Sequence, residues 1–240
     1  MGFSNSYEDV LRANAYAQLE FSGTYYLAYR DLPEIIGKNV SGFEALDFGC
    51  GTGRSTRFLK ELGFTVIGVD ISKSMINQAK LIDSKGNFQL IKDELFDQLN
   101  DEIFDLVLSI FTFDNIPTKE KKIKNLLEIA RVLKTEGSFI NLVSSPEIYF
   151  HEWSSFSTKD FPENKKAKSG EIVKIIITDL ADKRPVEDVV CYPEDYREMF
   201  AESGFRLVNS YKPLAKESEQ YKWVNETKIA PWTIYVLKKI

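Results

Sequence analysis

The chain reads ALDFGCGTGR from Ala45 to Arg54, an apolar stretch that runs directly into three glycines at alternate positions. A second apolar stretch, 65–69, ends in Asp70. This order is typical of a buried strand, a glycine turn at the start of a helix, and a carboxylate at the tip of the next parallel strand. The pattern therefore predicts a nucleoside site at the carboxyl edge of a parallel sheet.

The glycine spacing restricts which ligand the turn can hold. The dinucleotide fingerprint G-x-G-x-x-G needs its last glycine at the position of Arg54, and no Gly-Lys-Ser/Thr sequence follows as in a P-loop. The chain instead has G-x-G-x-G, with glycines at 49, 51 and 53. Glycine has no Cβ and tolerates positive φ, so the backbone can approach a ligand closely. This suits a zwitterionic amino-acid tail as well as a phosphate.

Five segments in order resemble the motifs of class I S-adenosylmethionine-dependent methyltransferases. They are LDFGCGTG at 46–53, GVDIS at 68–72, IKDE at 91–94, FDLVLS at 104–109 and RVLKTEG at 131–137. The resemblance implies S-adenosylmethionine as the cofactor and S-adenosylhomocysteine as its product. One departure is Thr135-Glu136, where the family commonly has Pro-Gly; we expect it in a turn far from the cofactor.

The resemblance also implies where the cofactor lies. It assigns the methionine moiety to Gly49 and Gly51, both ribose hydroxyls to Asp70, the adenine to Asp93 with Glu94, and the adenine face to Ile71. The other residues expected to contact the cofactor are Cys50, Met75, Ser109, Phe111, Tyr26 and Arg30.

A catalytic base is optional for this chemistry. Methyl transfer is an in-line displacement, and orientation can contribute ~7–11 kcal/mol against ~3–5 kcal/mol for a general base. Two candidates for such a base are His151, the only histidine, and Asp114, in the loop after the predicted fourth strand. The aromatic neighbours of Asp114, Phe111 and Phe113, are expected either to line the methyl-transfer site or to pack in the core. No metal site is expected.

Alternating strand and helix patterns continue through the chain. Besides the first two strands, we predict strands at 88–91, 104–109, 138–143, 205–211 and 232–238, and helices at 55–62, 72–82, 118–137 and 193–203. The helix after Thr118 is expected to bury Ile123, Leu126, Leu127, Ala130 and Leu133 and to stop at Gly137. The resemblance implies an α/β, Rossmann-like, seven-stranded and mostly parallel sheet with helices on both faces and the last two strands antiparallel.

One domain of 240 residues accounts for the whole chain. We divide it into an N-terminal helical lid (1–40), a cofactor-binding core (41–145), an insert that covers the substrate (146–190), and a C-terminal helix with two strands (191–240). A capping box at Ser6–Asp9 begins the lid, whose Tyr25, Tyr26 and Arg30 are expected to reach the cofactor or the acceptor. In the insert, 171–178 and 185–190 are predicted to form a β-hairpin.

The charge and the cysteine content of the chain limit the kinds of partner and the setting that we expect. The net charge is −5 and the densest basic run is Lys165-Lys166-Ala167-Lys168, so nucleic acid is not expected as a partner. Cys50 and Cys191 lack metal-ligand spacing, which indicates a reduced, cytoplasmic setting. The sequence has no apolar run of membrane-spanning length, and we expect a monomer or a homodimer.

Three classes of function stay open at this point. The favoured one is a methyltransferase that acts on nitrogen or oxygen of a small-molecule acceptor. A nicotinamide-dependent oxidoreductase is disfavoured by Arg54 and by the lack of a Tyr-x-x-x-Lys sequence near the fourth or fifth strand. The third is a non-catalytic module that keeps the cofactor-binding fold.

Overall fold

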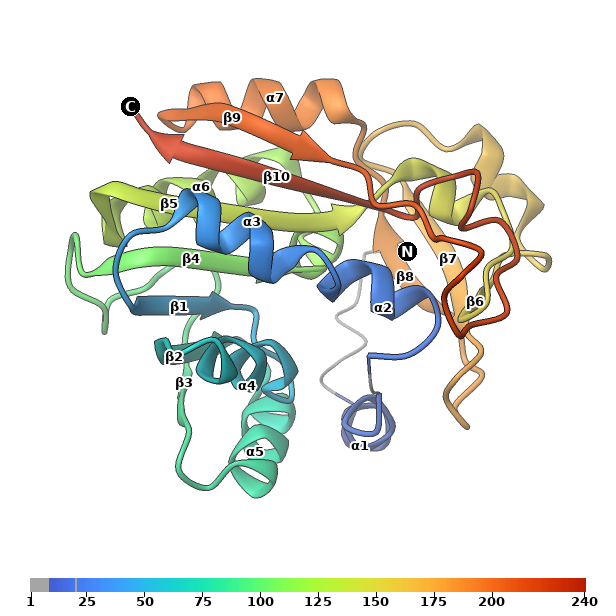
Figure 1. Ribbon diagram of the computed structural model, residues 1–240, viewed down its shortest axis with the longest axis horizontal. Coiled ribbons are helices and arrows are strands. Elements are labelled where there is room, and N and C mark those ends of the chain that lie inside the picture. Colours follow the sequence, from blue (N-terminus) through green and yellow to red (C-terminus); the bar gives the residue numbers. More distant parts are fainter. Residues whose placement is uncertain (1–8, 20) are drawn as a thin grey trace.

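A seven-stranded sheet runs through the middle of the protein, in the order β3-β2-β1-β4-β5-β10-β9 (Figure 1). The computed structural model describes residues 9–19 and 21–240. The strands of this sheet are β1 Glu44–Phe48, β2 Thr65–Asp70, β3 Asn87–Leu90, β4 Phe104–Ile110, β5 Leu133–Ser144, β9 Phe205–Tyr211 and β10 Trp232–Lys239. The first five pair in parallel, while β10 is antiparallel to both β5 and β9. The predicted Rossmann-like topology is confirmed.

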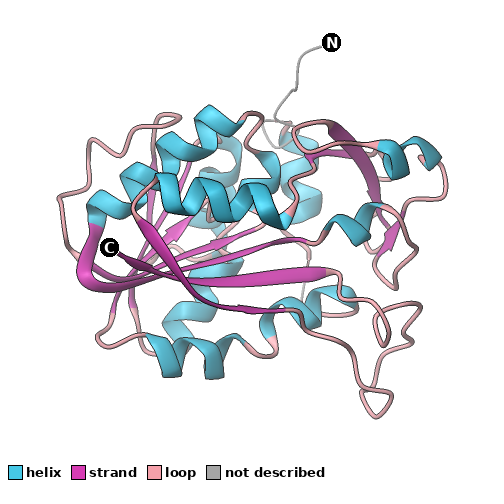
Figure 2. Cartoon of the chain, turned by 90° about the horizontal axis from the view of Figure 1, so that it is seen from above, coloured by secondary structure: helices cyan, strands magenta, loops and turns pink. Residues whose placement is uncertain are grey.

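Helices cover both faces of the sheet (Figure 2). The helices are α1 Val10–Tyr16, α2 Thr24–Tyr29, α3 Leu32–Asn39, α4 Arg54–Glu61, α5 Lys73–Ile82, α6 Lys119–Val132 and α7 Pro193–Glu202. One hydrophobic cluster joins the sheet to α2, α3 and α4, and a second joins it to α6 and α7. In the central strand β4, Leu106 and Leu108 belong to the first cluster and Val107 to the second, because successive side chains point to opposite faces. This explains the continuous apolar run of a strand that is buried on both faces.

The boundary between α6 and β5 differs from the prediction. The helix ends at Val132 and the strand begins at Leu133, so Thr135-Glu136 lies within β5 rather than in a turn, and Gly137 does not stop the helix. Leu133 pairs with Phe104 whereas Ser138 pairs with Leu106, so the residues between them depart from the regular ladder. No helix-breaking residue stands between Val132 and Leu133, so the sequence at this boundary is compatible with either a helix or a strand.

The buried face of α6 is also corrected at one position. Leu126, Ile129 and Val132 are fully buried, but Leu127 is half exposed. A shift of the helical face by one residue accounts for the difference, since Leu126 and Leu127 are 100° apart around the axis.

The predicted hairpin in the insert is confirmed. A second sheet contains β6 Phe156–Ser157, β7 Ile172–Ile177 and β8 Val186–Val189, all antiparallel. Strand β8 contacts the short 3-10 turn η2 Thr112–Asn115, and β7 contacts the turn η3 Pro146–Tyr149. These contacts place the insert beside the carboxyl ends of β4 and β5 (Figure 1).

Two of the three N-terminal helices, α2 and α3, pack in the core of the protein. Leu27 and Ala28 of α2 and Leu32 of α3 are fully buried in the first core cluster. Only α1 lies apart from the sheet, against α5. The predicted capping box begins at Ser6, outside the described residues; Asp9 itself caps α1, and its carboxylate accepts a hydrogen bond from Arg12 N at 2.9 Å.

A buried carboxyl group in β1 makes stability depend on pH. Asp47 accepts hydrogen bonds from Ser55 Oγ at 2.7 Å and Thr56 Oγ1 at 2.6 Å, yet burial raises its pKa from 3.8 to about 6. The folded state therefore holds this proton more tightly than the unfolded state. The resulting stability is fully present below pH 3.8 and is lost as the pH rises toward 6.

We expect Asp47→Asn to remove this pH dependence. Over that window the wild-type free energy of unfolding should lose up to about 3 kcal/mol that the variant does not lose. Urea unfolding of both proteins at pH 4.5 and pH 7 measures the difference, with exposed Asp97→Asn as the control. An equal pH response in wild type and Asp47→Asn contradicts the assignment.

Candidate cofactor and acceptor site

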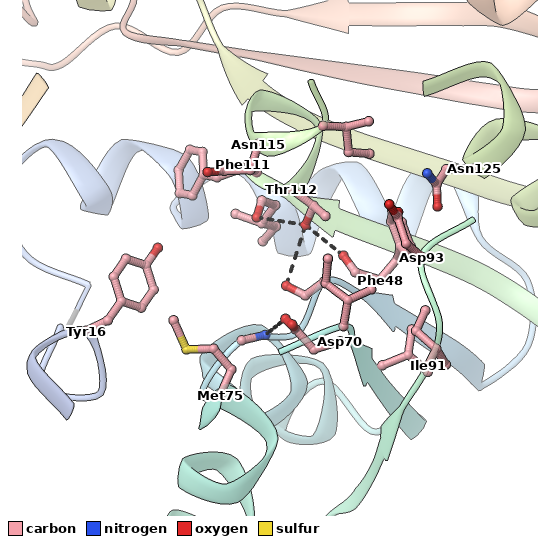
Figure 3. A pocket seen from close by; sticks show the side chains of 16 residues that line it. Tyr16, Phe48, Asp70, Met75, Ile91, Asp93, Phe111, Thr112, Asn115 and Asn125 are labelled. Atoms are coloured by element: carbon pink, nitrogen blue, oxygen red, sulfur yellow. Dashed lines mark hydrogen bonds between the residues drawn. The ribbon is translucent and has the colours of Figure 1, made fainter. Parts of the chain in front are cut away.

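The carboxyl ends of β1, β2 and β4 frame a cavity of about 120 Å³ (Figure 3). It is lined by Tyr16, Phe48, Gly49, Gly51, Val69, Asp70, Ile71, Met75, Ile91, Asp93, Ile110, Phe111, Thr112, Asn115, Ile116 and Asn125. Ligands of open parallel sheets bind at this edge, outside the carboxyl ends of the strands.

The glycine turn places its backbone directly against this cavity. Gly49, Gly51 and Gly53 have φ of +73°, +53° and +83°, in the region that favours glycine. A Cβ at Gly49 would meet Thr112 Oγ1 at 2.1 Å, so this glycine is required for packing. A Cβ at Gly51 would meet no protein atom within 4 Å. The space beside Gly51 is therefore open to a ligand.

Asp70 holds the turn and faces the same cavity. Its Oδ2 accepts a hydrogen bond from Gly51 N at 2.9 Å (Figure 3), and its Oδ1 accepts one from Ser72 N at 2.8 Å. Burial raises the pKa of Asp70, although these backbone donors act to lower it. Because a carboxylate has about four lone-pair sites, it keeps acceptor capacity for the hydroxyls of a ribose beside these backbone donors.

The rest of the lining suits a nucleoside beyond the ribose. Ile71 and Ile91 supply apolar surface next to the Asp70 carboxylate, and Asp93 supplies a polar group beyond them. A glycine turn, a carboxylate and an apolar wall thus line one cavity, and they suit an amino-acid tail, a ribose and an adenine. The residues present fit S-adenosylmethionine.

The structure brings seven of the predicted cofactor residues to this cavity: Gly49, Gly51, Asp70, Ile71, Met75, Asp93 and Phe111. Five others do not line it: Cys50, Ser109, Glu94, Tyr26 and Arg30. The Cys50 side chain packs with Ile76 and Phe88, and burial raises the pKa of its thiol well above the usual value. Ser109 is buried within β4. In both cases the side chain points into the core instead of toward the ligand.

The remaining three are held by partners elsewhere. Glu94 forms ion pairs with Lys121 at 3.2 Å and Lys124 at 2.8 Å. Arg30 pairs with Asp31 and Glu219, both at 2.8 Å, and the ring of Tyr26 lies 5.1 Å from that of Tyr221. The contacts of Arg30 and Tyr26 join α2 to the segment that precedes β10. None of the three residues lines the cavity.

The two candidate bases lie in very different environments. His151 lies outside the cavities described here, with Nε2 3.0 Å from Glu147 Oε2 and a side chain 37% exposed. Asp114 is buried and lines a second cavity, about 40 Å³, next to the first. The geometry therefore favours Asp114 and places His151 on the surface.

Sequence reasoning missed Tyr16, Thr112 and Asn115, which line the first cavity. Thr112 Oγ1 donates a hydrogen bond to Phe48 O at 2.9 Å and so joins the loop after β4 to the end of β1. Tyr16 belongs to α1 and points toward the space between Phe111 and Met75 (Figure 3). No local pattern marks Tyr16, because its role depends on where α1 docks.

Arg54, the residue after the glycine turn, is enclosed by aromatic rings. Its guanidinium carbon lies 4.8 Å from the centroid of Tyr25, 5.4 Å from Tyr29, 5.7 Å from Phe21 and 5.8 Å from Tyr16. Cation–π contacts of this kind attract a guanidinium to ring faces. Arg54 thereby joins the N-terminal aromatic residues to the first turn of α4.

The known proteins to which this chain is similar are methyltransferases. Residues 46–141 match a family model described as a methyltransferase domain. The solved structure of an S-adenosylmethionine-dependent methyltransferase from Clostridium acetobutylicum superposes with a TM-score of 0.62 at 15% identity, over 97% of this chain and 96% of that chain. This likeness concerns the fold.

Two curated relatives are similar in sequence. A ubiquinone biosynthesis O-methyltransferase of Pelagibacter ubique is 30% identical over 149 residues, 58% of this chain and 61% of that protein. A tRNA (carboxymethyluridine(34)-5-O)-methyltransferase of Arabidopsis thaliana is 29% identical over 146 residues, 61% of this chain and 34% of that protein. The similarity thus spans less than two thirds of either relative.

Taken together, residues 46–141 match a methyltransferase domain, and the chain shares the fold of S-adenosylmethionine-dependent methyltransferases. These similarities agree with the family and the cofactor predicted from the sequence. In the part of the chain that the structure describes, no helix is long and apolar enough to cross a membrane.

Proposed function

We propose that the protein transfers the methyl group of S-adenosylmethionine to a nitrogen or oxygen atom of a small-molecule acceptor. One observation carries the proposal: the cofactor cavity adjoins the second cavity, and Tyr16, Phe111 and Asn115 line both. Direct methyl transfer requires the donor and the acceptor to bind next to each other, and two adjoining cavities meet this requirement.

The bound cofactor supplies an electrophilic methyl group on a sulfonium. The protein orients the two reactants and excludes water from the site of transfer. Phe111 is at the boundary of the two cavities with φ of +62°, a conformation that is uncommon for an aromatic residue. Its N–H donates a hydrogen bond to Leu142 O at 2.9 Å, and its ring lies 4.6 Å from that of Trp232. Backbone strain held in place by such contacts is typical of functional sites.

The second cavity favours a small acceptor. Tyr25, Phe156 and Trp232 form part of its wall, and their rings pack against one another with centroids 5.0 to 6.3 Å apart. A volume of about 40 Å³ holds a small group, since a cavity needs roughly 10–15 Å³ to hold one water. The net charge of −5 and the carboxyl groups in this cavity disfavour a polyanion.

A nucleoside within tRNA is the second candidate acceptor, since one relative is named as a tRNA methyltransferase. Release of S-adenosylhomocysteine, measured against a metabolite panel and against total tRNA, separates the two. We expect turnover with a metabolite and none with tRNA; turnover with tRNA alone overturns the small-molecule assignment.

Calorimetric titration with S-adenosylhomocysteine and with NAD tests the two remaining classes. We expect S-adenosylhomocysteine to bind and NAD not to bind. Binding of NAD in its place would favour an oxidoreductase. Binding of the cofactor without turnover on either acceptor set would favour a non-catalytic module.

A further inference from the structure

The second cavity contains two buried carboxyl groups from segments far apart in the sequence. Asp114 comes from η2 and is 4% exposed, while Asp188 comes from β8 of the insert and is 8% exposed. Asp188 is on the inward face of β8 together with Val186, as the alternation of a strand requires. The insert thus brings a second acid to the one that follows β4.

In the part of the chain that the structure describes, neither carboxyl group forms an ion pair with a cation. Asp114 Oδ2 accepts a hydrogen bond from Ser144 N, and Asp188 Oδ2 accepts one from the Tyr149 hydroxyl, both at 3.0 Å. Among residues 9–19 and 21–240 no ion pair includes either acid. Lys122 is nearby, but its Nζ donates to the carbonyl oxygens of Phe113 and Ile116. Buried carboxyl groups are normally paired with a cation or kept neutral by a raised pKa, so a cationic ligand would supply a partner that the chain does not place in contact with this pair.

The rest of the cavity wall is aromatic. The rings that line it belong to Tyr16, Tyr25, Phe111, Tyr149, Phe156 and Trp232. The faces of such rings carry partial negative charge and attract ammonium groups. Aromatic walls with carboxyl groups among them are complementary to a cation with an apolar body, whereas an alcohol offers no charge and only one hydrogen-bond donor.

The electrostatics also suit the removal of a proton from the acceptor. Burial raises the pKa of Asp114, and burial together with the charge of Asp114 raises that of Asp188, while Lys122 opposes both shifts. Other titratable groups around the pair are three tyrosines of the cavity wall together with Tyr196 and Cys191, each with a pKa raised by burial; the three are Tyr16, Tyr25 and Tyr149. A carboxyl group that binds a proton more tightly takes one from an ammonium more readily.

On the basis of the proposed function, we propose that the acceptor is an amine, held in the second cavity by Asp114 and Asp188. One of the two carboxylates takes a proton from the bound ammonium, which leaves a nitrogen lone pair. That lone pair forms the new N–C bond to the methyl group as the C–S bond breaks, and the bonding electrons stay on sulfur. The products are an N-methylammonium and the thioether S-adenosylhomocysteine, with the proton on the carboxyl group.

Equilibrium binding tests the proposal without turnover. The probes are benzylamine and benzyl alcohol, which have the same apolar body, titrated by calorimetry into the protein saturated with S-adenosylhomocysteine. We expect the amine to bind at least about tenfold more tightly than the alcohol, since a charged hydrogen bond replaces a neutral one. Asp188→Asn and Asp114→Asn should each remove most of this preference.

Glu187→Gln is the matched control, because Glu187 is next to Asp188 in β8 but pairs with Lys174 outside the cavity. It should keep the full preference for the amine. Equal affinity for amine and alcohol in the wild type, no binding of the amine, or an undiminished preference in both asparagine variants overturns the proposal. If S-adenosylhomocysteine itself does not bind the wild type, the proposed function fails; if it binds and the amine preference is absent, only the amine assignment fails.

Discussion

Gly51→Val is expected to abolish measurable binding of S-adenosylhomocysteine in a protein that still folds. A side chain at this position meets no protein atom and enters the cofactor cavity, where it displaces the ligand from the turn. We expect a loss of affinity of at least about a hundredfold, or about 3 kcal/mol, as for an overpacked site. Calorimetric titration measures the affinity, and circular dichroism checks the fold.

Gly63→Val provides the matched control for backbone strain. Gly63 also has positive φ, +93°, and open space around it, but it lies in the turn between α4 and β2, outside the cavity. Both variants force valine into the same unfavourable backbone region, so a comparable loss of stability is expected in the two. Near-native affinity in Gly51→Val, or an equal loss in Gly63→Val, argues against the turn as the ligand site.

Asp70→Ala should weaken the binding of S-adenosylhomocysteine about ten- to a hundredfold, because we expect the carboxylate to accept charge-assisted hydrogen bonds from the ribose hydroxyls, which alanine cannot do. The substitution should also weaken binding indirectly, because Asp70 holds the glycine turn by accepting hydrogen bonds from Gly51 N and Ser72 N. Calorimetry with the 2′-deoxy analogue of the ligand separates the two. Direct ribose contact predicts that Asp70→Ala weakens the analogue less than the parent ligand.

Asp97→Ala, at an exposed position outside the cavity, serves as the control and should bind like the wild type. An unchanged affinity of folded Asp70→Ala removes the ribose assignment. Equal losses for the parent ligand and its 2′-deoxy analogue indicate that Asp70 acts through the shape of the turn alone.

Local signals in the sequence were sufficient for most of the sheet. The glycine turn, the apolar run of β4 and the capping residue Ser72, whose Oγ accepts from Met75 N, each act within a few residues. The end of α6 was mispredicted because Leu133 to Ser138 has no breaker at the true boundary, and tertiary pairing with β4 decides it. Propensity is overridden where a strand ladder competes for the same residues.

The site residues that come directly after the strands could be predicted from the sequence. Those that reach the site only through the packing of distant helices could not. Asp70 and the glycines are fixed by the β1–α4–β2 unit, whereas Tyr16 reaches the cavity only through the packing of α1. Arg30 reads as a ligand residue from its aromatic neighbours, but a partner far along the chain, Glu219, holds it. Asp188 had a usable signal: in Val186-Glu187-Asp188, strand alternation sets the acid on the same face as a buried valine.

A crystal structure with S-adenosylhomocysteine tests the central claim most directly, because that claim concerns where the donor lies relative to the second cavity. We expect the ribose hydroxyls at the Asp70 carboxylate, the adenine between Ile71 and Asp93, and the sulfur beside Phe111, facing the cavity that holds Asp114. A ligand bound elsewhere, or one whose sulfur points away from that cavity, contradicts the account.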